Sequence, residues 1–168
     1  KKNNTEPAII FKSENGYKTV LSWKDLNLNV TQISNWMKSN GIKKGDRVAA
    51  YLPNIPETVT AYISTAVLGS IWSSCSPDFG INGIHDRLGQ IEPKVLLTIN
   101  AYHYNGREHE CLAKIRAVKK QIPSIRFTYV IPFTETPIEL NHGEQKWNKL
   151  LDHVLDPFLN ESINVLHL

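Results

Sequence analysis

Short apolar runs alternate with longer segments of helical periodicity along most of this chain, and that alternation limits the folds it can adopt. Four of the runs are short and apolar enough for buried strands: residues 47–52, 71–75, 94–99 and 126–131. The segments between them place apolar residues three or four positions apart, so we expect helices beginning near Ile55, Ile81 and Glu108. Strands that alternate with helices form right-handed βαβ units. The pattern therefore predicts a three-layer α/β fold, with helices on both faces of a mainly parallel sheet.

Two further elements precede this alternating core. The pair Asn15-Gly16 stands between two apolar runs and predicts a β-hairpin at the N-terminus. The next segment predicts an amphipathic helix that Ser22 caps and Gly41 ends. Its buried face is expected to consist of the apolar residues at helical spacing: Trp23, Leu26, Val30, Ile33 and Met37.

The helix near Ile55 has its own expected cap and buried face. Asn54 can cap it, and Pro56 suits its first turn. Its apolar residues are expected to face the sheet: Val59, Tyr62, Ile63, Ala66 and Val67.

The last forty residues carry weaker signals. Two prolines and few apolar side chains predict a surface loop over residues 132–143, and residues 145–154 predict a short helix. That helix is expected to turn Trp147, Leu150 and Leu151 inward. Residues 163–168 predict a strand cut by the end of the chain. We expect one domain over 1–168, with three parts: a leading hairpin (1–22), the alternating core (23–131), and a loop, short helix and truncated strand (132–168).

Composition excludes several classes of partner. Lys and Arg total 19 against 16 Asp and Glu, a formal charge of +3, and the basic residues are scattered, so we expect no nucleic-acid partner. No apolar run approaches the roughly 18 residues of a membrane span, and no signal peptide is visible. The 2 cysteines lack CxxC spacing, which favours a reducing, cytoplasmic location. Since no Met stands at the start, we interpret the chain as a fragment.

Sequence motifs alone define no chemistry. The chain contains no G-x-G-x-x-G, no G-x-x-x-x-G-K-[ST], no G-x-S-x-G and no H-E-x-x-H. The densest polar segment is 103–111, at the carboxyl end of an expected parallel strand, where ligands of open α/β sheets bind. A metal site there would recruit His103, His109 and Cys111, but their spacing fits no standard zinc framework. We therefore expect no metal site.

An anion site is the better hypothesis for this polar segment. Gly106 permits close backbone approach, Arg107 offers a planar fork of donors, and a helix expected to follow would add its positive end. The alternative is a solvated Arg107 paired with Glu108 or Glu110, and the residues alone favour that alternative.

Residues near the end of the second expected strand allow two interpretations. Ser73, Ser74 and Ser76 form either a pocket at the strand end or merely a polar terminus, and chemistry alone favours the terminus. Cys75 is expected to be a buried thiol, since no neighbouring base or cation would lower its pKa.

Two blocks of the sequence, residues 45–57 and 68–80, resemble the AMP-forming acyl-CoA synthetases. Residues 86–87 and 90–95 extend the resemblance, which covers nearly the whole chain. It is strongest to the members that act on acetoacetate, because residues 72–79 differ from the Phe-Gly-Gly-Phe-Ser-Pro-Glu-Ala type stretch usual in the acetyl-CoA enzymes. This choice of substrate rests on flanking sequence and on no specificity residue.

The resemblance implies a two-step ligase. Such enzymes attack the α-phosphate of ATP with a carboxylate, release pyrophosphate, and transfer the acyl group from AMP to the thiol of CoA, using Mg²⁺. Their phosphate loop, adenine contacts and catalytic lysine all follow the region that this chain resembles. The resemblance therefore implies part of the large N-terminal domain of an adenylate-forming enzyme, without catalytic residues and inactive alone.

The resemblance also assigns residues to CoA. In the acetyl-CoA enzymes, an Arg-x-Gly-Arg stretch meets the 3′-phosphate ADP end of CoA, and it corresponds here to residues 104–107. Gly106 and Arg107 are retained, whereas Tyr104 replaces the first arginine. Three roles for Tyr104 stay open: it stacks on the adenine, it forms a hydrogen bond with a phosphate, or it packs against the protein. Ser73 and Ser74 fall where those enzymes place glycines beside the CoA channel.

Two alternatives to an acetoacetate–CoA ligase stay open at this point. One is a ligase for acetate or another short-chain acid. The other is a domain that binds a nucleotide or a partner and performs no chemistry.

Overall fold

Five parallel strands form the central sheet of the computed structural model, which describes residues 4–152. Their order across the sheet is β4-β3-β5-β8-β9. The strands are β3 (Arg47–Tyr51), β4 (Ile71–Cys75), β5 (Val95–Ile99), β8 (Phe127–Ile131) and β9 (Glu144–Lys146). The four strands expected from the apolar runs all pair in parallel, so the predicted α/β sheet is confirmed.

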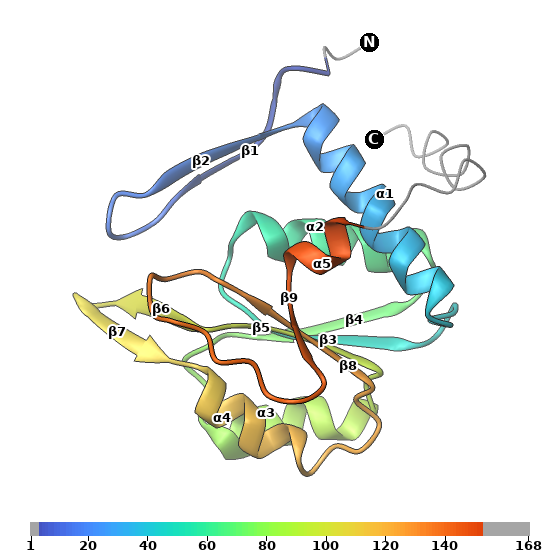
Figure 1. Ribbon diagram of the computed structural model, residues 1–168, viewed down its shortest axis with the longest axis vertical. Coiled ribbons are helices and arrows are strands. Elements are labelled where there is room, and N and C mark those ends of the chain that lie inside the picture. The colour runs from blue at the N-terminus through green and yellow to red at the C-terminus, as the bar shows by residue number, and fades with distance from the viewer. Residues whose placement is uncertain (1–3, 153–168) are drawn as a thin grey trace.

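Helices cover both faces of this sheet (Figure 1). On one face lie α1 (Trp23–Ser39), α2 (Pro56–Val67) and α5 (Asn148–Leu151). On the other lie α3 (Ile81–Leu88), extended by a 3-10 turn over Gly89–Ile91, and α4 (Leu112–Lys119). All five residues of β5 are buried, as a strand covered on both faces must be. The three layers are therefore confirmed.

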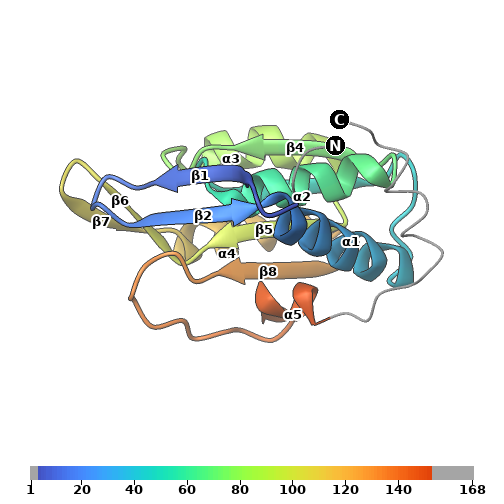
Figure 2. The same cartoon turned by 90° about the horizontal axis from the view of Figure 1, so that it is seen from above.

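The N-terminal hairpin and the capped α1 follow the prediction, but Trp23 is only half-buried and Trp36, which was not expected on the buried face, is buried. Strands β1 (Pro7–Lys12) and β2 (Lys18–Ser22) pair antiparallel and project beyond the sheet (Figure 2). The Oγ of Ser22 accepts from the backbone N of Asp25 at 3.1 Å, which caps α1. Trp36 packs edge-on against the rings of Phe127 and Tyr129, each at 5.0 Å between centroids. These aromatic contacts attach α1 to strand β8.

The buried face of α2 is not the predicted one. Val59 and Tyr62 are 40% and 52% exposed, whereas Thr60, Ser64 and Thr65 are buried. Each of these three hydroxyls donates to a carbonyl one turn earlier, at 2.7 to 2.8 Å, so burial leaves none unsatisfied.

Small side chains let α2 lie close to α1, where the Ser34 hydroxyl donates to the carbonyl of Ser64 at 3.3 Å. Asn54 does not cap α2, because Ile55 occupies the cap position and makes no side-chain bond there.

A second hairpin replaces the expected start of a helix. The helix expected from Glu108 is wrong: β6 (Ala101–Tyr104) pairs with β7 (Arg107–Glu110), and α4 begins only at Leu112. The turn is Asn105-Gly106, with φ angles of 52° and 69°. Positive φ at both central residues is typical of a type I′ hairpin turn, which Asn-Gly pairs favour.

The last described elements differ in part from expectation. The loop over 132–143 is confirmed. The helix expected over 145–154 is confirmed only for the single turn of α5, because β9 occupies the first part of that range and residues 153–154 lie outside the described residues. Trp147 and Leu150 are buried as expected, and Leu151 is half-buried. β9 forms because its residues pair in register with β8. The strand expected over 163–168 lies outside the described residues.

Candidate functional site

Three of the five expected CoA residues lie at the tip of the β6–β7 hairpin (Figure 1). Tyr104 and Arg107 face each other directly across the turn, and Gly106 forms part of it. Tyr104 is 65% exposed, and Arg107 is exposed as well. A Cβ built on Gly106 would meet no atom within 4 Å, so the turn is open to an approaching ligand.

Arg107 has a different environment from the one expected. It lies in β7 and not at a helix N-terminus, so the positive end of a helix adds nothing to it directly. The alternative pairing with Glu108 or Glu110 is also absent, since within residues 4–152 its guanidinium makes no hydrogen bond or ion pair. Glu108 instead lies 3.5 Å from the Nε2 of His103, and it accepts a hydrogen bond from the hydroxyl of Thr136. No donor of Arg107 is therefore engaged by the described part of the chain.

The histidines of the hairpin have aromatic and acidic neighbours rather than a shared ligand. His103 pairs with Glu108, and His109 stacks on Tyr102 with ring centroids 5.2 Å apart. Cross-strand pairs at successive positions project to opposite sides of a hairpin. Within the described range 4–152, no three His, Cys, Asp or Glu side chains are grouped to hold a metal ion.

The two expected serines lie elsewhere. Ser73 and Ser74 belong to β4, which is the end strand of the sheet, whereas the β6–β7 hairpin follows β5. Ser74 is exposed and accepts from the indole N–H of Trp72 at 3.2 Å. The structure thus divides the five expected residues between two places at the carboxyl side of the sheet.

The loop after β4 is firmly held. Burial raises the pKa of Tyr51, and its hydroxyl donates to the carbonyls of Pro77 and Phe79, the latter at 3.0 Å. The guanidinium of Arg87 lies 3.9 Å from the ring centroid of Phe79. Cys75 is buried, as expected, and burial raises the pKa of its thiol to about 11.

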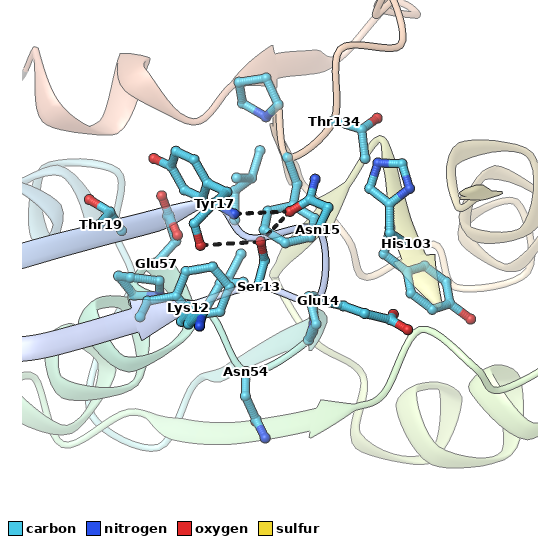
Figure 3. Close-up of a pocket in the computed structure, with 18 of the residues that line it drawn as sticks. Lys12, Ser13, Glu14, Asn15, Tyr17, Thr19, Asn54, Glu57, His103 and Thr134 are labelled. Carbon is cyan, nitrogen blue, oxygen red and sulfur yellow. Dashed lines mark hydrogen bonds between the residues drawn. The ribbon is translucent and has the colours of Figure 1, made fainter. Parts of the chain in front are cut away.

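A cavity of about 560 Å³ lies where the N-terminal hairpin approaches the carboxyl edge of the sheet (Figure 3). Its walls come from four places: the β1–β2 hairpin, the start of α2, strand β6 and the segment after β8. None of the five expected CoA residues lines it. The sequence did carry one signal for this cavity: residues 53–57 follow β3, and ligands of open α/β sheets bind at the carboxyl ends of the strands.

Glu57 is the most unusual side chain of this cavity. It stands in the first turn of α2, half-buried, and burial raises its pKa. Within the described part of the chain it has no partner other than its own backbone N–H. A carboxylate without a cation partner is therefore held against the cavity wall.

The sequence places this fold in a known family. The chain belongs to the AMP-binding enzyme family, whose sequence profile matches residues 1–162. It is 41% identical over 133 residues to an acetoacetyl-coenzyme A synthetase of Rhizobium meliloti (strain 1021), covering 79% of this chain and 20% of that protein. It is 39% identical over 155 residues to an acetoacetyl-CoA synthetase of Macaca fascicularis, covering 92% of this chain and 23% of that protein.

A solved structure is similar over nearly the same extent. The acetoacetyl-CoA synthetase from Streptomyces lividans matches with a TM-score of 0.84 and 35% identity, over 90% of this chain and 23% of that one. The chain thus spans about a fifth of the length of these relatives. No helix within residues 4–152 is long and apolar enough to cross a membrane.

Proposed function

We propose that this chain is part of an acetoacetate–CoA ligase. In the first step a carboxylate oxygen of acetoacetate attacks the α-phosphate of ATP, which forms an acyl-adenylate and releases diphosphate. In the second step the thiol of CoA takes the acyl group and releases AMP. The observation that supports this proposal is the match to the Streptomyces lividans synthetase, which has a TM-score of 0.84 and 35% sequence identity over 90% of this chain.

The chain contributes structure and a CoA contact to this reaction. No catalytic residue is assigned to it, and the resemblance assigns Mg²⁺ and most ATP contacts to other parts of the longer protein. The free guanidinium of Arg107 suits a phosphate of CoA, because it can donate two parallel hydrogen bonds to one anion. Tyr104 and Gly106, at the same tip, belong to this proposed contact.

Ser73 and Ser74 complete the proposal. They lie on β4 beside the loop that Tyr51 and Arg87 hold in place. We assign them to the wall of the CoA channel.

The test is diphosphate exchange into ATP by the full-length protein. Acetoacetate should support exchange well above a control without carboxylate, and acetate should support it less. A clear preference for acetate would overturn the substrate assignment and leave a short-chain acyl-CoA ligase. Failure of every carboxylate to support exchange would favour the domain that binds a nucleotide or partner without chemistry.

A further inference from the structure

Asn100 has the most extensively bonded side chain at the carboxyl edge of the sheet. It follows β5 directly and is 1% exposed. Its Nδ2 donates to the carbonyl and hydroxyl of Thr134, both at 3.1 Å, and to the carbonyl of Thr136 at 2.9 Å. Its Oδ1 accepts from the backbone N–H groups of Phe133 at 2.8 Å and Thr134 at 3.2 Å. One amide thus fixes the segment after β8.

The backbone of Asn100 also forms the base of the β6–β7 hairpin. Its N–H donates to the carbonyl of Ile131 at 3.2 Å, and its carbonyl accepts from the N–H of Cys111 at 2.9 Å. The hairpin therefore leaves and rejoins the sheet at this residue.

A second connection reaches the hairpin farther out. The hydroxyl of Thr136, whose carbonyl Asn100 holds, donates to the carboxylate of Glu108. Glu108 lies 3.5 Å from His103 on the opposite strand and is adjacent in sequence to Arg107. His103 and Thr134 appear on the same side of the cavity in Figure 3. The contacts run from Asn100 through the 133–136 segment to the residue beside Arg107.

This connection matters because the outer part of the hairpin, residues 104–108, is exposed. The two strands of the hairpin have four residues each, and an isolated two-stranded hairpin is marginally stable in water. Arg107 itself has no partner within residues 4–152 that would hold its guanidinium. A displacement of about 1 Å is enough to weaken a two-point contact with an anion.

We propose that Asn100 is a positioning residue, which orients the β6–β7 hairpin through the 133–136 segment and so sets Arg107 toward CoA. This inference rests on the CoA contact proposed above. A purely structural Asn100 would affect the stability of the protein and leave the kinetics of the folded enzyme unchanged. A positioning Asn100 affects the step that uses CoA and spares the adenylate step.

The experiment compares variants of the full-length protein. Asn100→Asp keeps the acceptor and removes the three donated bonds, and Thr136→Val removes only the hydroxyl that reaches Glu108. The matched control is Asn148→Asp, because Asn148 is exposed and its side chain makes no hydrogen bond within residues 4–152. We expect KM for CoA to rise about 10-fold in Asn100→Asp and about 3-fold in Thr136→Val, with acetoacetate-dependent diphosphate exchange unchanged. In the double variant the KM for CoA should rise by less than the product of the two single-variant increases, because both substitutions act through one series of contacts.

Hydrogen exchange of the backbone amides over residues 101–110 supplies a readout independent of CoA. It should accelerate about 10-fold in Asn100→Asp and stay unchanged in the control. A raised KM with unaltered exchange would overturn the proposal, since Asn100 would then act other than through the hairpin. Faster exchange with an unaltered KM would overturn it too, provided that Arg107→Ala raises the KM.

The two proposals fail in distinguishable ways. If Arg107→Ala leaves the KM for CoA unchanged, the CoA contact is wrong, and hydrogen exchange alone then decides whether Asn100 positions the hairpin. If Asn100→Asp does not fold, Thr136→Val is judged by the same two measurements.

Discussion

Arg116 on α4 and Glu144 on β9 form a two-point ion pair. The Nε of Arg116 lies 3.0 Å from Oε1 of Glu144, and its Nη2 lies 2.8 Å from Oε2. The Glu144 side chain is only 3% exposed and also accepts from the backbone N–H of Asn141 at 2.9 Å. Since β9 has three residues, this pair is a main attachment of the outermost strand to the rest of the fold.

Replacing Arg116 should therefore destabilise the chain. Arg116→Lys offers one point charge in place of a planar fork, and we expect it to lower the free energy of unfolding by about 1 to 3 kcal/mol. Urea denaturation measures the change. The control is Lys149→Ala, which breaks the exposed 3.3 Å pair with Asp152 and should have an effect below about 0.5 kcal/mol. Equal effects of the two variants would contradict a special role for the Arg116–Glu144 pair.

Glu57 should make stability depend on pH in a predictable direction. Burial raises its pKa in the folded chain, so the folded state binds the proton more tightly than the unfolded state does. The favourable contribution of Glu57 to the free energy of unfolding is fully present below the pKa that this residue has in the unfolded state, about 4.3. That contribution is lost as pH rises through the pKa of Glu57 in the folded state.

Glu57→Gln removes this titration, so the variant should gain stability over the wild type as pH rises from about 4 to 7. Unfolding free energies of both proteins at several pH values measure the difference. If the free energies of unfolding of the two proteins change in parallel with pH, Glu57 ionises in the folded chain without destabilising it.

Arg107→Ala in the full-length protein should raise the KM for CoA by roughly 10- to 100-fold, the effect of losing a charge-assisted hydrogen bond. The adenylate half-reaction should stay nearly unchanged, because the proposed contact is to CoA alone. Arg126→Ala is the control, since Arg126 is an exposed arginine just before β8, at the other edge of the sheet.

Dephospho-CoA tests which phosphate Arg107 meets. If it contacts the 3′-phosphate, the wild type should use dephospho-CoA poorly and Arg107→Ala should discriminate less between the two thiols. An unchanged preference would assign Arg107 to the solvated surface.

The purified 168-residue chain should catalyse neither step by itself. The resemblance assigns the groups that stabilise charge at the α-phosphate to other parts of the longer protein, and binding residues alone do not replace them. Acetoacetate-dependent exchange of labelled diphosphate into ATP measures the first step. Exchange above a control without protein would refute this prediction.

The sequence predicts the parallel sheet well because buried strands such as β5 leave a continuous apolar signal. The β6–β7 hairpin was missed for the opposite reason. Its second strand, Arg107–Glu110, is polar throughout, so the Asn105-Gly106 pair lacked the apolar flanks that made Asn15-Gly16 recognisable. A strand paired in a projecting hairpin needs no buried side chains, and periodicity cannot find it.

Two other differences depend on contacts that only the folded chain shows. The polar face of α2 is buried because the hydroxyls of Thr60 and Ser64 bond to carbonyls one turn back, which hydropathy ignores. At the candidate site, the residue types around Arg107 suggested an ion pair with a neighbouring glutamate. In the structure Glu108 instead pairs with His103 and accepts a hydrogen bond from Thr136. The spacing of residues in the sequence does not show which of these partners a glutamate will contact.

The position of β4 at the end of the sheet bears on how this chain behaves in concentrated solution. Within residues 4–152 it pairs with β3 alone, so its outer edge presents unpaired backbone donors and acceptors. Ile71 on that strand is 50% exposed, and Tyr62 packs against Trp72 beside it at 6.2 Å between ring centroids. An open edge with an exposed apolar side chain is a template for adding a strand from another molecule. The isolated chain should therefore aggregate through β4, and a lysine in place of Ile71 should keep it monodisperse.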